Sequence, residues 1–506
     1  MAKHLTDLLE LKNIKYDLIK AENDNNPLIN AISYNSKTTE PGNIFVCLVG
    51  ENFDAHKFVD DAILKGAVAV IAQKNIKGLS VPVVVVENTA KVMAVVATEI
   101  YDNPSKRIRL IGITGTNGKT TVTHLVEKIL EKNKKKCGLI GTLGHRFKST
   151  DKYLNSKHTT PQAPELQSYL AEMVDQKFDY TVMEVSSHAL DLHRVQDCHF
   201  AVALITNLTQ DHLDFHVTME NYASAKLKLF SQLAESELEN KTAIINIDDN
   251  YAGKFLEIIP DNITKLTYGL ASDADIQAVD IEYSVNGTVF TCVAPEKTFK
   301  VNLKLKGLFS VYNALSAISV SIAEKVPPEI ICEALEEIEN IPGRFETVSS
   351  NPLIIVDYAH TPDGLSNVLT AARKLVPDGG ELITLFGCGG DRDPTKRPKM
   401  AKIVEDLSDK IIVTSDNPRT EDPQQIITDI LTGIKSLGSS HVKVEIDRAL
   451  AIEMAIKSAK PDDVIVVAGK GHEDYQILAD RTIHFDDREE VKKVIEKLNL
   501  AKSIST

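Results

Sequence analysis

The sequence predicts an α/β protein built from three domains. Its 506 residues are about three times the length of an average domain. Short apolar runs alternate with helical patterns along most of the chain, which is typical of sheets whose strands are largely parallel. Two polar breaks interrupt this alternation, at 102–107 and at 339–346. We therefore expect domains at residues 1–106, 107–342 and 343–506.

The first domain is expected to hold a small sheet with helices around it. Its apolar runs, typical of buried strands, are 43–50, 67–73 and 81–88. Helical patterns at about 57–65 and 90–101 lie between or after them. The segment DNPSKR (102–107), with its proline, asparagine and charges, is typical of a linker.

The central domain is expected to hold a mostly parallel sheet. The apolar run IRLIGITG (108–115) leads through a glycine-containing loop into the helical pattern TTVTHLVEKILEKN. Further buried strands are predicted at 180–186, 200–207 and 242–247, with helical segments between them.

The third domain begins where Pro342 and Gly343 end a helical pattern. Four apolar runs then alternate with helices, which predicts a doubly wound, Rossmann-like sheet. Ligands of such sheets bind at the carboxyl ends of the strands. Polar runs follow several of the predicted strands directly: GCGGDRD, SDNPR and GKGHED.

Composition excludes several classes of protein. Hydrophobic residues make up 43 % and charged residues 25 %, as in ordinary globular chains. The net charge of −14 argues against binding to nucleic acid or to an anionic membrane, although a local basic pocket could still hold a small anion. The six cysteines lack metal-ligand spacing, and no apolar run reaches the roughly 18 residues of a membrane span. We expect a cytoplasmic monomer without a signal peptide.

A phosphate-binding loop is predicted between the first strand and helix of the central domain. A loop placed there directs backbone N–H groups and the positive end of the helix at an anion. Lys119 would reach the terminal phosphates of a nucleotide, and the Thr120 hydroxyl would coordinate Mg²⁺. The loop is a shortened variant, because the usual spacing puts a glycine where this chain has Ile113. Its residues are Gly115, Thr116, Asn117, Gly118, Lys119, Thr120 and Thr121.

Two further residues follow strands near this loop. Glu184 ends the run YTVMEVSS, and His212 comes just after FAVALITN. Each alone is typical of a solvated side chain. Beside a phosphate loop, however, acidic residues at strand ends are where the Mg²⁺ of a nucleotide is held. We therefore expect both residues at a metal site.

Lys226 lies on the apolar face of a predicted helix. Tyr222, Leu229 and Phe230 share this face, whereas Lys228 lies off it. A lysine in such a place either extends its amine to water or keeps a desolvated, partly neutral and reactive amine. The sequence leaves both alternatives open.

Taken together, the motifs resemble the Mur ligases of peptidoglycan synthesis, over all three domains and in the family's order. The motifs that carry the resemblance are GTNGKTT, EVSSHALDLHR, NLTQDHLDFH, SAKLKLF, YNALSA, IPGRFE, DYAHTPDG, GCGGDRDPTKRP, SDNPRTEDP and GKGHEDYQ. The match is best to the members that add the third residue of the peptide. The resemblance implies a bacterial enzyme of cell-wall biogenesis, on which cell shape and cell division depend.

The resemblance implies an ATP-dependent amide-bond ligase. The D-glutamate carboxylate of UDP-MurNAc-L-Ala-D-Glu would attack ATP and form an acyl phosphate, which the amine of a diamino acid then displaces. Phosphoryl transfer requires mainly positioning and charge neutralisation. Lys119, Arg344 and two Mg²⁺ ions would supply the positive charge. The implied partners are small molecules only: ATP, the UDP-linked dipeptide and the amino acid.

The resemblance also assigns residues to subsites. Thr120 and Glu184 match ligands of the first Mg²⁺, and Glu184, His212 and a carbamylated Lys226 match those of the second. Residues matching the adenine and ribose contacts are Asn313 and Asp357. Residues matching the contacts to the UDP-linked dipeptide are Ser36, Thr159, Thr160, Ser186 and Arg194. Residues matching the amino-acid pocket are Arg392, Asp416, Asn417, Pro418, Arg419, Gly469 and Glu473.

The predicted amino acid is meso-diaminopimelate, with L-lysine as the alternative. Diaminopimelate carries a carboxylate at its far end, which an arginine binds through two hydrogen bonds. Arg419 would bind this carboxylate, and Glu473 the ammonium group beside it. The other interpretation is a loop arginine paired with Glu421 or Asp422.

Three positions depart from the family pattern. His158 stands where many members have asparagine, and Leu192 where they often have glutamine. The segment GENFDAHKF (50–58) also differs from the usual form, so no contacts to the uracil base are assigned there. None of these positions is expected at the ATP or metal site.

Two rival functions are weaker. A folylpolyglutamate synthase shares the loop and the lysine but lacks a separate N-terminal domain and the DNPR run. A nucleotide switch or motor would need a guanine- or water-positioning motif such as NKxD, which the sequence does not contain.

Overall fold

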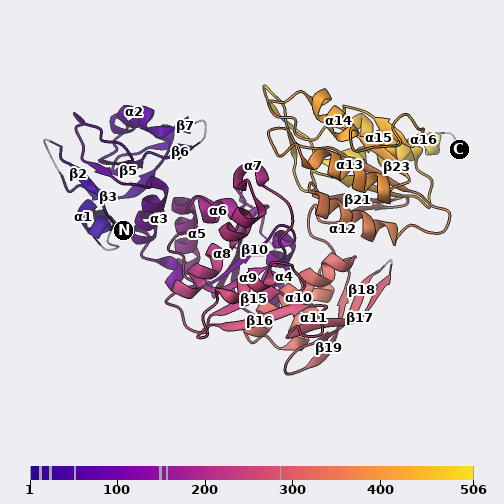
Figure 1. The fold of residues 1–506 in the computed structure, drawn as a ribbon, viewed down its shortest axis with the longest axis horizontal. Helices are drawn as coiled ribbons and strands as arrows, with labels where there is room; N and C mark the ends of the chain where they lie inside the picture. Colours follow the sequence, from indigo (N-terminus) through magenta and orange to yellow (C-terminus); the bar gives the residue numbers. More distant parts are fainter. Residues whose placement is uncertain are drawn as a thin grey trace.

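The chain folds into three successive α/β units, each with its own sheet, which confirms the predicted fold class. The structure is a computed structural model that describes residues 2–504, except 11–13, 22–24, 51–52, 148–150, 155–157 and 285. Glu51 and Asn52, in the divergent segment 50–58, are thus outside the described residues. Figure 1 shows the N-terminal and C-terminal units at opposite ends of the molecule, on either side of the central unit.

The N-terminal unit holds a five-stranded sheet. Its strands, in spatial order, are β2 (Asp17–Ile19), β9 (Val83–Val85), β8 (Ala69–Ala72), β5 (Asn43–Val46) and β4 (Ala31–Ser33). All neighbours are parallel except β2 and β9. Two short pairs add β1 (Lys3–His4) with β3 (Leu28–Ile29), and β6 (Val49–Gly50) with β7 (Phe53–Asp54). The helices are α1 (Leu5–Glu10), α2 (Val59–Leu64) and α3 (Thr89–Ile100), with 3₁₀ turns η1 (Ser36–Thr38), η2 (Ala55–Phe58) and η3 (Pro104–Lys106).

The central unit holds a ten-stranded sheet. Its spatial order begins with β12 (Gly144–Arg146), β11 (Cys137–Gly141), β13 (Tyr180–Glu184), β10 (Arg109–Thr114) and β14 (Phe200–Ile205). It continues through β15 (Thr242–Asn246), β16 (Thr264–Gly269), β17 (Ile276–Ser284), β18 (Gly287–Val293) and β19 (Thr298–Leu303). The strands from β11 to β17 run parallel, and four of them, β10, β13, β14 and β15, are the strands that the sequence predicted. β12, β18 and β19 pair antiparallel with their neighbours, and no strand of the central domain was predicted beyond residue 247.

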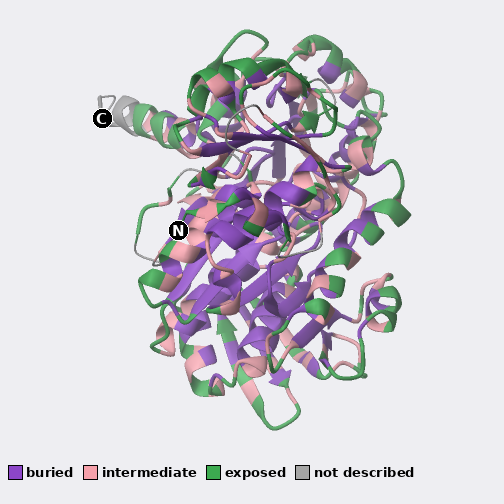
Figure 2. Ribbon diagram, turned by 90° about the vertical axis from the view of Figure 1, so that its left-hand side faces the viewer, coloured by how far each residue is buried: buried purple, intermediate pink, exposed green. Residues whose placement is uncertain are grey.

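Helices cover both faces of the central sheet. They are α4 (Lys119–Lys132), α5 (Ala163–Asp175), α6 (Ser187–Asp191), α7 (Leu213–His216), α8 (Met219–Glu235), α9 (Ala252–Glu257), α10 (Leu308–Ala323) and α11 (Pro328–Glu337). Consecutive residues of β10 face opposite apolar clusters, with Ile111 in one and Leu110 in the other. Strands buried on both faces need continuous apolar runs, which is why these strands were predictable. Figure 2 shows these strands buried within the molecule.

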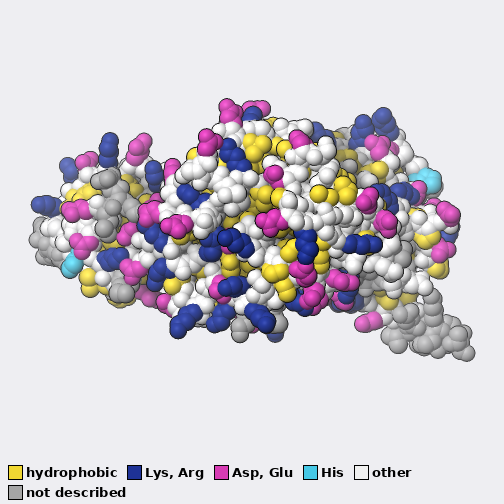
Figure 3. Space-filling view, turned by 90° about the horizontal axis from the view of Figure 1, so that it is seen from below, with side chains coloured by type: hydrophobic (Ala, Val, Ile, Leu, Met, Phe, Trp, Pro, Cys, Tyr) yellow, Lys and Arg dark blue, Asp and Glu magenta, His cyan; other side chains and the backbone are white. Residues whose placement is uncertain are grey.

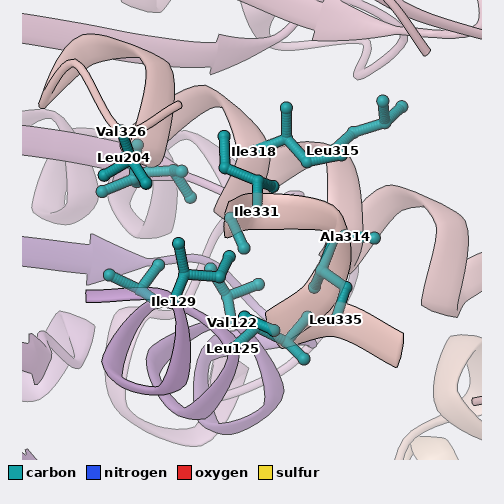
Figure 4. Packing of buried hydrophobic residues seen from close by; sticks show 14 of the residues in the cluster. Val122, Leu125, Ile129, Leu204, Ala314, Leu315, Ile318, Val326, Ile331 and Leu335 are labelled. Carbon is teal, nitrogen blue, oxygen red and sulfur yellow. The ribbon is translucent and has the colours of Figure 1, made fainter. Parts of the chain in front are cut away.

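The packing of α4 fixes the phosphate loop that precedes it. Val122, Leu125 and Ile129 recur at helical spacing and are fully buried. They pack beside residues of α10 and α11 such as Ile318 and Leu335, as Figure 4 shows. The first turn of α4 is therefore held rigidly at the carboxyl end of β10.

The C-terminal unit holds a six-stranded sheet with the predicted doubly wound arrangement. Its order is β20 (Glu346–Ser350), β21 (Leu353–Asp357), β25 (Val464–Ala468), β22 (Leu382–Phe386), β23 (Lys410–Val413) and β24 (Val442–Val444). All neighbours are parallel except β20 and β21. The helices are α12 (Pro362–Arg373), α13 (Lys396–Leu407), α14 (Pro423–Leu431), α15 (Arg448–Ser458) and α16 (Asp487–Ile504), and a hairpin joins β26 (Tyr475–Ile477) to β27 (Thr482–His484).

The surface carries both signs of charge. Acidic and basic side chains are interspersed over the face drawn in Figure 3. Among the helices that the structure describes, none combines the length and the apolar composition needed to cross a bilayer.

Candidate active site

The phosphate loop has the predicted strand–loop–helix geometry. Gly115 and Gly118 adopt φ values of 142° and 87°, which disfavour residues with a side chain. A Cβ atom on Gly115 would lie 1.8 Å from the Thr206 Oγ1, and one on Gly118 would lie 2.4 Å from the Asn313 Oδ1. Only glycine fits at either position.

The loop is tethered to the segment that follows β14. The Thr116 N–H donates to the Asn207 carbonyl over 2.8 Å, and the Asn117 N–H donates to the Asn207 side-chain oxygen over 2.9 Å. The first N–H groups of α4, from Lys119 onward, have no acceptor within the helix because no turn precedes them. These groups and the positive helix end form an anion site.

Lys119 is half-buried and folded back onto the loop. Its Nζ donates to the carbonyls of Gly115 and Thr116 over 2.8 and 2.9 Å. Desolvation lowers the pKa of Lys119, although the negative charges of Glu184 and Asp211 oppose this shift. An anion bound at the loop would add a negative charge beside Lys119 and so stabilise its ammonium form.

Glu184 lies directly beside the loop, as predicted. Its carboxylate is buried and accepts from the Thr120 hydroxyl over 3.0 Å. It also accepts from the N–H and the hydroxyl of Thr142 over 2.8 and 2.9 Å. The Arg344 guanidinium, from the start of the C-terminal unit, donates to the Thr120 Oγ1 over 3.0 Å. The structure thus brings together Thr120, Glu184 and Arg344.

Lys226 lies on the other side of the loop. Its side chain is 1 % exposed, and its Nζ donates to the Gly115 carbonyl over 2.9 Å. This is the same carbonyl oxygen to which Lys119 donates. Burial and the charge of Lys119 hold the pKa of Lys226 well below its ordinary value. Of the two alternatives left open by the sequence, the structure shows the desolvated amine.

His212 lies near Lys226, and among the described residues its N–H hydrogen bond and its ion pair are with Asp211, not with Glu184. Its backbone has φ 54°, and its ring packs 4.8 Å from the ring of His188. Desolvation lowers the pKa of His212, opposed by Asp211, whose carboxylate lies 3.4 Å from Nε2. Among the described residues, no three His, Cys, Asp or Glu side chains are grouped closely enough to hold a metal ion. The predicted ligand set instead combines Thr120 and Lys226 with Glu184 and His212.

The chemistry of the donors can be compared with the needs of Mg²⁺. The ion prefers hard oxygen ligands, such as the hydroxyl of Thr120 and the carboxylate of Glu184. These two groups already lie 3.0 Å apart. The residues on this side of the loop therefore fit one Mg²⁺, whereas a site at Lys226 would need its amine converted to an anion.

A small pocket opens beside the first turn of α4. Thr121 and Arg344 line it together with the apolar side chains of Leu305, Phe309 and Phe345. The rings of Phe309 and Phe345 lie 5.6 Å apart. None of these apolar residues was predicted at the site, although Phe345 follows Arg344 directly in IPGRFE. Such a pocket suits a flat aromatic group.

The two predicted nucleotide residues lie around the same region. Asn313 is buried on α10, one turn after Phe309, and faces Gly118 of the loop. Asp357 ends β21 and accepts from the N–H groups of Phe345 and Ala359, each over 2.6 Å. Burial raises the pKa of Asp357 to about 6, opposed by the charge of Arg344.

The residues expected to grip a dipeptide gather beside Glu184. The Thr160 hydroxyl donates to the Glu184 carbonyl over 2.9 Å and accepts from the Ser186 N–H over 3.1 Å. Arg194 donates to the Thr160 carbonyl over 3.1 Å. Thr159 and Thr142 share a hydroxyl contact of 3.1 Å.

The structure does not bring Ser36 into this group. Ser36 lies in η1 of the N-terminal unit, where its carbonyl accepts from Lys65 over 2.7 Å. Two residues before Ser36, the Tyr34 hydroxyl links the N-terminal unit to the central one by donating to Glu165 of α5 over 2.6 Å. The departures His158 and Leu192 both have exposed side chains.

The residues expected to bind an amino acid gather at the carboxyl edge of the C-terminal sheet. Asn417 donates to the Glu473 carboxylate over 2.8 Å. A Cβ on Gly469 would lie 2.6 Å from the Asp416 Oδ2, and one on Gly390 would lie 1.9 Å from the Pro418 carbonyl. The backbones of these loops are therefore closely packed.

Lys470 belongs to this cluster and was not predicted. Its side chain is fully buried, and its Nζ lies 3.1 Å from the Glu473 carboxylate and 3.3 Å from the Asn417 Oδ1. Burial raises the pKa of Glu473, an effect that Asp416 reinforces and Lys470 opposes. Lys470 follows Gly469 in the motif GKGHE, which is the signal that could have identified it.

Arg419 does not pair with the carboxylates considered for it. Its guanidinium donates to the Gly390 carbonyl over 2.7 Å, and its backbone has φ 54°. Glu421 instead pairs with Arg397 over 2.8 Å, and Asp422 caps α14. No carboxylate of the described residues forms an ion pair with Arg419. Arg392 is exposed and donates only to the neighbouring carbonyl of Asp391, over 2.7 Å.

Comparisons with known proteins give a consistent result. Residues 113–321 match the family model of the Mur ligase middle domain, and residues 343–471 that of the Mur ligase, glutamate ligase domain. The UDP-N-acetylmuramoyl-L-alanyl-D-glutamate--2,6-diaminopimelate ligase of Clostridium botulinum is 45 % identical over 498 residues, covering 97 % of this chain and 99 % of the relative. A ligase of the same name from Bacillus cereus is 45 % identical over 474 residues, covering 93 % and 94 %. A solved structure of a ligase of that name is 32 % identical, with a TM-score of 0.67 and coverage of 99 % and 100 %.

Proposed function

The chain belongs to the Mur ligase family, and from that premise we propose that it joins meso-2,6-diaminopimelate to UDP-N-acetylmuramoyl-L-alanyl-D-glutamate. The observation that carries this proposal is the 45 % identity, over nearly the full length of both chains, to ligases named for that reaction. The product is a precursor of peptidoglycan. The geometry of the phosphate loop, of Glu184 and of Arg419 supports the proposed reaction.

The proposed reaction consumes ATP and proceeds through an acyl phosphate. A D-glutamate carboxylate oxygen bonds to the γ-phosphorus as the bond to the β–γ bridging oxygen breaks, which releases ADP. The amine of the amino acid then adds to the acyl carbon, loses a proton, and expels phosphate as the amide forms. Lys119 and the N–H groups at the start of α4 hold the phosphates, and Arg344 adds positive charge.

Nucleotide binding is proposed at the junction of the central and C-terminal units. The pocket beside Thr121, with its two aromatic rings, suits the adenine, with Asn313 beside it. Asp357 would accept from the ribose hydroxyls. The remaining residues of the loop, Gly115 to Thr121, would surround the phosphates.

Magnesium is proposed at two places around the loop. Thr120 and Glu184 would hold one ion, and Glu184, His212 and a carbamylated Lys226 would hold the second. When bound, these ions supply positive charge that neutralises the phosphates. The contact between Thr120 and Glu184 supports the first site.

A carbamate on Lys226 is supported by the crowding of two lysines. Lys119 and Lys226 both donate to the Gly115 carbonyl, and two ammonium groups on one oxygen repel each other. A neutral Lys226 amine has a free electron pair that bonds to the carbon of CO₂, and the nitrogen then loses a proton to solvent. The product is an anion that offsets the charge of Lys119 and offers oxygen ligands.

The substrate chain is proposed to run across the molecule. Ser36 would contact the uridine diphosphate, and Thr159, Thr160, Ser186 and Arg194 the dipeptide. Residues 1–106, 107–342 and 343–506 are proposed as the uridine-nucleotide, ATP-binding and amino-acid-binding domains. The six free cysteines fit the reducing cytoplasm, where we propose that the enzyme acts as a monomer.

Phosphate release from ATP tests the proposal as a whole. We expect release only when the UDP-linked dipeptide and a diamino acid are both present. Release with the dipeptide alone, or with a folate and glutamate in its place, would contradict the assignment.

Arg419 supports diaminopimelate over L-lysine as the amino acid. Its guanidinium has no carboxylate partner among the described residues, so it is available for the distal carboxylate of diaminopimelate, while Glu473 takes the ammonium group. Arg419 is half-buried, and L-lysine offers it no carboxylate to bind, so L-lysine should be used at least about tenfold less efficiently. Arg392, Asp416, Asn417, Pro418 and Gly469 would complete the pocket.

Replacing Arg419 with alanine should abolish most activity with diaminopimelate. The KM values for ATP and for the UDP-linked dipeptide should stay near those of the wild type, because Arg419 lies in the amino-acid pocket. The measurement is kcat/KM for meso-diaminopimelate and for L-lysine in both enzymes. A wild-type preference for L-lysine would show the amino-acid assignment to be wrong and leave the ligase assignment standing.

A further inference from the structure

Two of the most deeply buried charges in the C-terminal unit face each other. Arg448 is the first residue of α15 and Asp487 the first of α16, and both side chains are fully buried. The Arg448 Nε donates to one carboxylate oxygen of Asp487 over 2.7 Å, and Nη2 donates to the other over 2.7 Å. This is the two-pronged geometry that only an arginine forms with a carboxylate.

The same guanidinium also holds two backbone carbonyls. Nη2 donates to the Ala468 carbonyl over 3.0 Å, and Nη1 donates to the Ser415 carbonyl over 3.3 Å. Ala468 is the last residue of β25, and Ser415 follows β23 by two residues. The proposed amino-acid pocket has two loops, which begin at Gly469 and at Asp416. The Ala468 carbonyl thus comes one residue before the first loop, and the Ser415 carbonyl one residue before the second.

The two loops belong to strands that are not neighbours. In the sheet, β22 lies between β25 and β23, so no ladder of hydrogen bonds joins them directly. Arg448 spans this gap at the carboxyl edge of the sheet. Side chains from the two loops then meet through the contacts of Asn417 with Glu473 and with Lys470.

A buried ion pair of this kind contributes little to stability by itself, because both charges are removed from water. Its geometry, however, fixes the spacing of the groups that it joins. We propose that Arg448, held by Asp487, is a positioning residue that sets the separation of the two amino-acid-binding loops and so the discrimination between diaminopimelate and L-lysine. The inference rests on the proposed function, since it concerns the same pocket.

The variant Arg448→Lys tests this role. A lysine keeps the positive charge beside Asp487 but has no planar fork, so it cannot hold both carbonyls and the carboxylate together. We expect the KM for meso-diaminopimelate to rise at least tenfold and its advantage over L-lysine to fall at least tenfold. The KM values for ATP and for the UDP-linked dipeptide should change less than twofold.

A matched control lies at the opposite edge of the same sheet. Arg373 also pairs with an aspartate, Asp409, over 2.6 Å, and also donates to a backbone carbonyl, that of Leu407, over 2.7 Å. Asp409 precedes β23, so this pair holds the amino ends of the strands. The variant Arg373→Lys should change no KM by more than twofold.

A second variant covers the case in which Arg448→Lys does not fold. In the double variant Arg448→Met with Asp487→Leu, an apolar pair replaces the charges, and such replacements commonly preserve stability. It should melt near the wild-type temperature and still show the raised KM for diaminopimelate. A variant that binds diaminopimelate as the wild type does, or that raises all three KM values equally, overturns the proposal. Failure of the proposed function is distinct, because the wild type itself would then not ligate diaminopimelate.

Discussion

Replacing Lys119 with alanine is expected to lower kcat/KM about a thousandfold or more. Removing one donor from a site that stabilises transition-state charge costs on the order of 10²–10³ in rate, and Lys119 would contact the transferred phosphoryl group itself. Its amine lies over the loop, where it donates to the carbonyls of Gly115 and Thr116. ATP-dependent phosphate release with all substrates present is the measurement.

The Lys119 variant should remain folded. Desolvation already lowers the pKa of this lysine, so its removal relieves a charge in an unfavourable place. Lys128 provides the control, because it lies on the same helix and pairs with Glu337 over 3.0 Å, away from the loop. Lys128→Ala should keep at least half of the activity. Near-normal turnover by Lys119→Ala with an unchanged melting temperature would remove the phosphate-loop assignment.

Replacing Lys226 with alanine is expected to abolish nearly all activity, and short carboxylic acids should partly restore it. If the working group at this position is a carbamate, then alanine leaves a space beside Gly115 that acetate or formate fills with the same charge. An unmodified ammonium group would not be replaced by an anion. The measurement is turnover of Lys226→Ala against the concentration of added acid.

Two controls separate a carbamate from a merely structural lysine. Lys228→Ala alters the exposed face of α8, where Lys228 pairs with Asp191, and should stay active. Lys119→Ala should gain nothing from the added acids. Carbamate formation releases a proton and is therefore favoured at higher pH. Activity of the wild type that is lost on removing CO₂ should thus return more fully at higher pH when CO₂ is added back. Full activity of protein whose Lys226 is shown to be unmodified at neutral pH with CO₂ present would contradict the proposal.

Most of the long parallel strands were predictable because they are buried on both faces. Strands of this kind are continuous apolar runs, and the short length of such a run, as in β10, favours a strand over a buried helix. The strands from β16 to β19 were missed for the opposite reason. Alternate residues of β17 and β19 face solvent, and their polar residues weaken the apolar signal that marks a buried strand. The same holds for β24, which is largely exposed at the edge of its sheet.

At the candidate site, sequence motifs located residues but not their partners. The contact of Thr120 with Glu184 followed from two strand ends meeting at one edge of a sheet. Lys119 and Lys226 share the Gly115 carbonyl because of the way α8 packs beside the phosphate loop. This packing cannot be predicted from any local sequence pattern. The pairing of Glu421 with Arg397 likewise could not be predicted, and it removes one of the carboxylates considered as a partner of Arg419.

The hydrogen bond from Tyr34 to Glu165 bears on how the enzyme measures its substrate. It joins the unit that contains Ser36 to the helix beside the dipeptide residues, so the separation of the two ends of the substrate site is set by the protein. A peptide residue extends a chain by at most about 3.3–3.6 Å. On the proposed assignment, a precursor with one residue fewer holds its carboxylate that far short of Lys119, and a precursor with one residue more overshoots. On this assignment, the position of the N-terminal unit determines how many peptide residues the substrate must already carry.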